Sequence, residues 1–144
     1  MTDLSSETNT THHAATHLPH IPCEGFIRNT RPGYVLAVGE NLSNQLGMGV
    51  DVDDKKKPQL AKELEATNVT QIAAGGMHSA CLTQDGLVFT FGCNDEFALG
   101  REDEEDVGKV ELPEKCVEVT AGDSHCAALS ETGVVYAWGT FRVS

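Results

Sequence analysis

The sequence is poor in basic residues, and this shortage limits what it can bind. Of 144 residues, 10 are Lys or Arg and 22 are Asp or Glu, which gives a formal net charge of -12 and a pI near 4.7. Because DNA phosphates and anionic membrane surfaces are also negative, nonspecific binding to either is unfavourable. We expect a partner with a basic surface instead.

Long apolar runs are missing as well. No stretch approaches the ~20 apolar residues that a membrane span requires. Residues 1–22 have neither the basic start nor the apolar block of a signal peptide. We therefore expect a soluble, intracellular chain without membrane contact. Its hydrophobic fraction of 40% is enough to form the core of one domain.

The cysteines lack the close spacing that zinc and redox motifs use. Their number is odd and no C-x-x-C pair occurs, so small buried thiols in a reducing compartment are expected. A metal site built from neighbouring His and Cys residues is conceivable by residue type, and a zinc or thiol enzyme would follow from it. The five cysteines are Cys23, Cys81, Cys93, Cys116 and Cys126.

What the sequence does contain is an internal repeat centred on Ala73–Gly100. Its landmarks recur 47 residues later, and a period of this length is typical of stacked or radial repeat proteins. A preceding, partial unit is related by a shift of 53, which places Gly33 on Gly86 and Asn41 on Asn94. The pairs separated by 47 are His78 and His125, Leu82 and Leu129, Gly86 and Gly133, and Gly92 and Gly139.

Each unit predicts several short antiparallel strands. Apolar alternation around Ile72 or Val119 indicates a first strand, and a small-residue turn and a second strand follow. A four-residue turn ending in Gly86 or Gly133 leads to a third strand with large aromatic residues, and a fourth short segment is expected around Pro58 or Pro113. Four such strands per period favour a propeller blade over a solenoid coil. The aromatic residues must then pack on neighbouring blades.

Other segments predict less regular structure. Residues 1–31 are polar and indicate a disordered tail, and residues 32–144 an incomplete propeller. Lys55, Lys56 and Lys57 are expected in a solvated loop. The helix-like run Leu60–Ala66 is expected to form a strand followed by a loop or single turn. A metal site from His78, Cys81, His125 and Cys126 is disfavoured because equivalent positions lie on separate blades, so we expect no metal and no cofactor.

Several segments together resemble the regulator of chromosome condensation family, the chromatin-bound nucleotide exchange factors of the small GTPase Ran. They are GGMHSACL, FGCNDEFALGR, GKVELPEK, AGDSHCAALSETGVVYAWGTFR and VGENLSNQLGMG. The resemblance covers about Gly33 to Arg142. It implies an all-β, seven-bladed propeller, of which this chain would form about two blades plus an incomplete one. It also implies binding to Ran, contact with histones or nucleosomes, nuclear localisation and no covalent chemistry.

The resemblance suggests where Ran would bind. Asp123, His78, Asp95 and Arg142 match positions on or near the Ran-facing side. Asp123 is the strongest candidate because it breaks the repeat, its equivalent being Gly76. His78 and His125 recur, which favours a hydrogen bond within the blades. The positions that the repeat itself requires are Gly75, Gly122, His125, Gly92, Gly139 and Trp138.

The chain also departs from the family pattern. Its tail carries only Arg28 and Arg31 before the propeller, so direct DNA binding is not expected from it. Leu42 stands where the family's Ran-facing surface tends to carry an acid. The chain ends near Arg142, where the family's loop grows into a wedge that presses on the GTPase. We therefore expect a truncated product with impaired exchange, or alternatively a propeller-repeat adaptor that binds partners without affecting a GTPase.

Overall fold

The computed structural model describes residues 30–103 and 105–141. The predicted tail thus lies outside the described residues except for Thr30 and Arg31, and so do Cys23 and Arg142. The strands of the described chain run from Leu36 to Gly139. Gly33 N–H donates to the Val69 carbonyl at 2.8 Å, which ties the entry segment to the second sheet.

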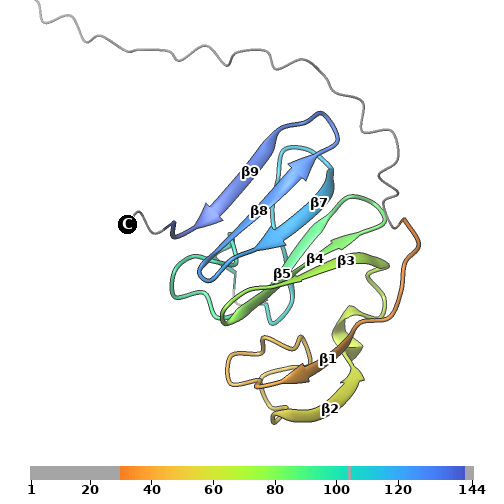
Figure 1. Cartoon of the computed structure of the whole chain (residues 1–144), viewed down its shortest axis with the longest axis vertical. Coiled ribbons are helices and arrows are strands. Elements are labelled where there is room, and N and C mark those ends of the chain that lie inside the picture. Colours follow the sequence, from red (N-terminus) through yellow and green to blue (C-terminus); the bar gives the residue numbers. More distant parts are fainter. Residues whose placement is uncertain (1–29, 104, 142–144) are drawn as a thin grey trace, which may run out of the picture.

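In the described residues, nine strands form three antiparallel sheets, which we name blades 1 to 3 (Figure 1). Blade 1 pairs β1 with β2, blade 2 has the order β3-β4-β5-β6, and blade 3 has the order β7-β8-β9. The strands are β1 (Leu36–Gly39), β2 (Lys55–Leu60), β3 (Val69–Ala74), β4 (His78–Thr83), β5 (Val88–Gly92), β6 (Gly108–Lys109), β7 (Cys116–Ala121), β8 (His125–Ser130) and β9 (Val135–Gly139).

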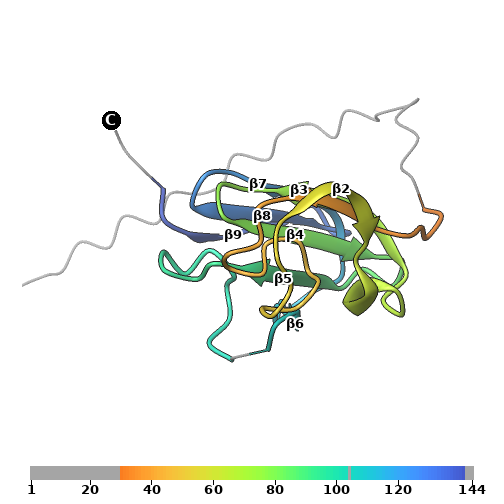
Figure 2. The ribbon, with the colours of Figure 1, turned by 90° about the horizontal axis from the view of Figure 1, so that it is seen from below.

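Blade 2 confirms the predicted four-stranded meander. Its strands are hydrogen-bonded in sequence order, with β3 at one edge and the short β6 at the other (Figure 2). Antiparallel pairing within every sheet argues against the solenoid alternative. The predicted position of the fourth strand is confirmed in blade 1, where β2 contains Pro58. It is wrong in blade 2, because β6 ends at Lys109, before Pro113. Proline has no N–H for a ladder, and in blade 2 the chain leaves the sheet before reaching it.

The β4–β5 and β8–β9 hairpins turn in the same way. Gly86 N–H donates to the Thr83 carbonyl at 3.0 Å, and Gly133 N–H donates to the Ser130 carbonyl at 3.1 Å. The φ angles of these glycines are +80° and +93°, as the four-residue turn predicts. These turns lie at the end of the blades that points away from the β3–β4 and β7–β8 turns (Figure 1).

The core lies between the blades rather than inside any one of them. One face of blade 2 packs on blade 3, and its other face packs on blade 1. This confirms the expectation that each blade must pack on its neighbours. The cluster toward blade 3 includes Ala80, Leu82, Val88, Val119, Cys126 and Ala128, and the cluster toward blade 1 includes Val35, Leu64, Val69, Cys81 and Phe91.

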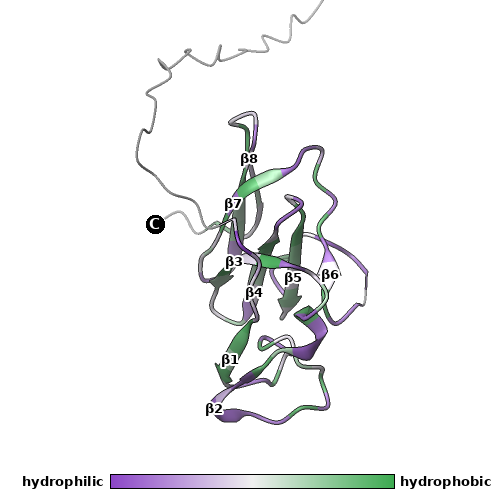
Figure 3. Ribbon diagram, turned by 90° about the vertical axis from the view of Figure 1, so that its right-hand side faces the viewer, coloured by the Kyte–Doolittle hydropathy of each residue, from purple (hydrophilic) through white to green (hydrophobic). Residues whose placement is uncertain are grey.

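The lysine cluster does not lie in a loop, contrary to the prediction. Lys55, Lys56 and Lys57 begin strand β2, which pairs with the apolar strand β1 (Figure 3). Lysine and proline are tolerated there because exposed sheet edges are commonly protected by such residues. The segment that follows forms a single 3-10 turn, Lys62–Leu64, as expected. In the part of the chain that the structure describes, no helix could cross a bilayer.

Candidate partner-binding site

The β3–β4 and β7–β8 turns of neighbouring blades are stacked on each other. Gly76 N–H donates to the carbonyls of Gly122, at 3.3 Å, and of Asp123, at 3.2 Å. A Cβ added at Gly76 would lie 2.6 Å from Asp123 Oδ1, so only glycine allows this approach. Asp123 itself is exposed. Asp123, which breaks the repeat, therefore contacts Gly76, the equivalent residue of the preceding unit, and faces solvent.

His78 fills the space between these two turns. It is 2% exposed, and its Nε2 lies 3.2 Å from Cys126 Sγ in the next blade. A Cβ at Gly75 would lie 2.3 Å from His78 Cε1, so the ring rests directly on that glycine. Burial lowers the pKa of His78, and a hydrogen bond to the His125 backbone opposes this. Direct contact of the ring with a partner, which remains a prediction, would require it to leave this space.

His125 occupies the equivalent place in blade 3 with different neighbours. Its ring lies over Gly122, where an added Cβ would be 2.2 Å from its Cε1. The same ring is 4.5 Å from that of Phe141, centroid to centroid, and tilted by 31°. Gly122 N–H donates to the His125 carbonyl at 2.8 Å, as Gly75 does to His78. The recurring Gly and His pair thus closes the same turn twice.

The loops that follow the third strands join these turns to form one surface. Strands β5 and β9 end at Gly92 and Gly139, each packed against the neighbouring turn. Cys93 N–H donates to the Met77 carbonyl at 2.9 Å, and Thr140 N–H donates to the Ser124 carbonyl at 2.9 Å. We call the surface formed by residues 40–47, 75–77, 93–100, 122–124 and 140 the loop face. It lies on the left side of Figure 1.

Aromatic side chains hold the loops of the loop face in place. The Trp138 ring lies over Gly100 of the preceding blade, and its Nε1–H donates to the Ala98 carbonyl at 2.9 Å. The Phe91 ring, 1% exposed, lies over Gly47 in the same way. These contacts fix the loop that carries Asp95, which is exposed on the loop face. The structure thus brings Asp95 and Asp123 to one side of the molecule.

Sequence reasoning missed Arg101, which organises the acidic run after the loop. Its guanidinium is almost fully buried, pairs with the Asp103 carboxylate, and donates to the carbonyls of Thr90 at 3.0 Å and Glu105 at 2.7 Å. Like charges over residues 102–106 by themselves favour a repelling, flexible loop, but Asp103 and Glu105 fold around this cation. A lone arginine at the start of an acidic run was the available signal.

Most of the described thiols are buried. Cys81, Cys116 and Cys126 are buried, as expected, whereas Cys93 is half-buried. Burial raises the pKa of Cys81 and of Cys126 to about 12, which keeps both protonated. Across residues 30–103 and 105–141, no group of three or more His, Cys, Asp or Glu residues is placed to hold a metal ion.

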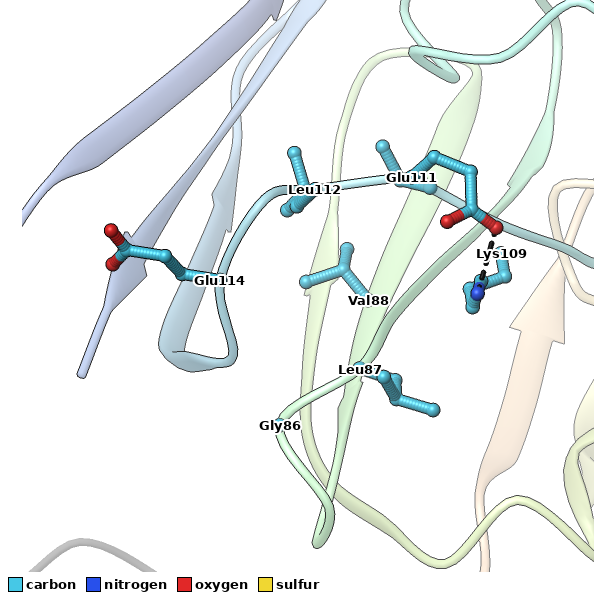
Figure 4. Close-up of a pocket in the computed structure, with 8 residues that line it drawn as sticks. Gly86, Leu87, Val88, Lys109, Glu111, Leu112 and Glu114 are labelled. Carbon is cyan, nitrogen blue, oxygen red and sulfur yellow. Dashed lines mark ion pairs between the residues drawn. The ribbon is translucent and has the colours of Figure 1, made fainter.

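A small recess opens on the outer side, between blades 2 and 3 (Figure 4). Its volume of about 30 Å³ is roughly the space of one water molecule and far below that of a substrate pocket. Lys109 Nζ and Glu111 Oε1 form an ion pair of 2.7 Å at its border, and the Glu114 carboxylate points away from it. The recess therefore does not compete with the loop face as a functional site.

Radially packed meander blades, joined by stacked glycine-rich turns and aromatic contacts, define a β-propeller repeat protein. The sequence matches the regulator of chromosome condensation (RCC1) repeat over residues 32–82 and 85–129. The chain belongs to this family. Its curated relatives include the regulators of chromosome condensation of Mus musculus and Homo sapiens, 54% and 51% identical over 119 residues. Each alignment covers 79% of this chain and 28% of the relative.

Structural comparison agrees with this assignment. The fold matches Prp20p from Saccharomyces cerevisiae, whose structure was described with its binding to Gsp1p and histones, with a TM-score of 0.71 and 32% identity. The match covers 78% of this chain and 30% of Prp20p. The repeat also occurs elsewhere. A probable E3 ubiquitin-protein ligase, HERC4 of Mus musculus, is 43% identical over 72 residues, which are 50% of this chain and 7% of the ligase.

Proposed function

We propose that this chain binds the small GTPase Ran through the loop face and contributes to guanine nucleotide exchange. The observation that carries the proposal is Asp123. It is the exposed acid that replaces Gly76 of the preceding unit, and it is held in place by hydrogen bonds between the stacked turns. The high identity to regulators of chromosome condensation supports the same assignment.

The mechanism requires binding only. A protein that binds the nucleotide-free GTPase more tightly than the nucleotide-bound form weakens nucleotide binding by the same factor. A negatively charged face suits this role because a chain of net charge -12 attracts a basic GTPase surface and accelerates the encounter. Asp123 and Asp95 would accept hydrogen bonds from Lys or Arg of the GTPase, the stronger kind of polar contact.

Exchange by this chain is expected to be weak. The chain spans 28% of the length of its mouse and human relatives, so most of the surface that such a relative could present to Ran is not contained in it. We expect measurable affinity for nucleotide-free Ran together with slower nucleotide release than the mouse relative produces. Equal release rates would refute the claim that the remaining part is needed.

The affinity of Asp123→Asn for nucleotide-free Ran, measured by calorimetry, tests the assignment. Loss of one charge-assisted hydrogen bond is expected to weaken binding about tenfold. The matched control is Asp85→Asn, because Asp85 is exposed in the turn at the opposite end of the blade. Equal effects of the two substitutions, or no binding by the unmodified chain, would contradict the proposal.

A second candidate function is a protein-interaction adaptor without exchange activity. The similarity to a ubiquitin-ligase repeat over half of this chain favours it, because the blade pattern alone does not separate the two classes. The affinity of an adaptor for its partner would not depend on which nucleotide Ran carries.

Nuclear localisation and histone contact are further parts of our proposal. The negative charge suits basic histones, and a histone pull-down in physiological salt tests that contact.

A further inference from the structure

The loop face contains one residue whose backbone conformation does not suit its side chain. Phe97 has a φ of +57°, in the left-handed region that large side chains rarely occupy. The equivalent position in the preceding unit is Asn44, with a φ of +59°. The two loops therefore share a backbone turn, and only one of them carries a residue type that adopts it readily.

At Asn44 the local structure explains the residue. Its Oδ1 accepts from the N–H groups of Met48, at 3.1 Å, and Gly49, at 2.8 Å, and its Nδ2 donates to the Asp106 carbonyl at 3.1 Å. The side chain is 2% exposed. Asparagine is thus both tolerated by the left-handed backbone and used by the loop.

Neither reason applies to Phe97. A phenyl ring makes none of these hydrogen bonds, and the residue is 45% exposed, so burial in the core does not account for it. Strained residues persist where the surroundings or a function retain them. An exposed aromatic ring is also a frequent anchor of protein interfaces.

Other exposed side chains of the loop face fit an interface with a particular chemistry. Met77, 49% exposed, belongs to the turn bonded to the same loop, and Leu42, 83% exposed, lies in the equivalent loop of blade 1. The exposed acids Asp95 and Glu96 directly precede Phe97 in the loop. Apolar side chains bordered by carboxylates complement an apolar pocket bordered by Lys or Arg.

We infer that Phe97 is an apolar anchor of the loop face, which inserts into a pocket within the basic surface of nucleotide-free Ran. This inference rests on the proposed function and adds a residue to it. Asp123 and Asp95 supply charge, and Phe97 supplies the desolvated contact at which binding energy concentrates. Phe97 also makes this loop differ chemically from its equivalent in blade 1.

Phe97→Asn separates an anchor from a structural residue, because asparagine relieves the backbone conformation while removing the ring. If Phe97 is an anchor, this substitution should stabilise the fold and weaken binding. The melting temperature of the variant rises by ~4 °C, and its affinity for nucleotide-free Ran falls about tenfold. The control is Val134→Asn, since Val134 is 43% exposed at the opposite end of the blades. It is expected to leave the affinity unchanged.

Each contrary result has a distinct meaning. An unchanged affinity of Phe97→Asn, with the unmodified chain binding Ran, overturns the anchor alone. A lowered melting temperature overturns it too, because Phe97 would then be structural. Self-association in sedimentation that Phe97→Asn abolishes would assign the ring to a second copy of the chain. Failure of the unmodified chain to bind Ran overturns both the proposed function and the anchor.

Discussion

Gly75→Ala tests the stacking of the two turns most sharply. The added Cβ would lie 2.3 Å from His78 Cε1, 2.6 Å from the Gly122 carbonyl oxygen and 2.7 Å from His78 Nδ1. Two of these atoms belong to a buried ring and one to the backbone of the next blade, so no flexible side chain can move aside. The imidazole must be displaced or the turns must separate.

The expected cost follows from the contacts that would be lost. Overpacking of a filled site costs about 1–3 kcal/mol. Separating the turns also weakens the hydrogen bonds that Gly76 N–H makes to blade 3, worth about 1 kcal/mol. We therefore expect the free energy of unfolding to fall by about 2–4 kcal/mol, measured by urea titration followed by circular dichroism.

The chain provides a matched control. Gly33 has no atom within 4 Å of an added Cβ, so Gly33→Ala should change the free energy of unfolding by less than about 0.5 kcal/mol. If Gly75→Ala were as mild as this control, the stacked turns would not be the rigid junction that positions Asp123. The explanation of the recurring Gly and His pair would then be wrong.

Two further predictions concern the junctions between blades, and a third concerns the buried guanidinium of Arg101. Trp138→Phe keeps a ring beside the preceding loop but loses the N–H donated to Ala98, and should cost about 1 kcal/mol in urea unfolding; no change would refute that bond. Because burial lowers the pKa of His78 from 6.5, the unfolded chain binds more protons, so stability should fall as pH drops below about 6.5. His78→Gln should reduce that slope, and an unchanged slope would contradict it. Arg101→Met introduces the residue type found at the equivalent Met48. It should lower the free energy of unfolding by about 2–4 kcal/mol in the same titration. A loss below about 0.5 kcal/mol would show that the buried cation is dispensable.

The repeat made most of the strand positions predictable. The offset of 47 places His78 and His125 at equivalent turns, and the glycine and aromatic landmarks place the hairpins. This succeeded because each unit must bury the same faces against its neighbours. Asp123 also stood out in the sequence, since a carboxylate at a position equivalent to Gly76 has no role in the repeat itself.

The features that sequence reasoning missed depend on contacts rather than on periodicity. Lys55 to Lys57 lie in an edge strand, where largely exposed side chains leave no period-two signal. The burial of Arg101 depends largely on carbonyl groups, and its place at the start of an acidic run was the one signal of it in the sequence. The strained backbone of Phe97 could have been suspected from its equivalence to Asn44, a residue type that often adopts that conformation.

The affinity of this chain for Ran in two nucleotide states tests the central claim most directly. Calorimetry with the same preparation of Ran, with and without GDP, should show at least about tenfold tighter binding to the nucleotide-free form. A chain that promotes nucleotide release by binding must prefer the nucleotide-free form in this way. Equal affinities for the two states would contradict the account and favour an adaptor.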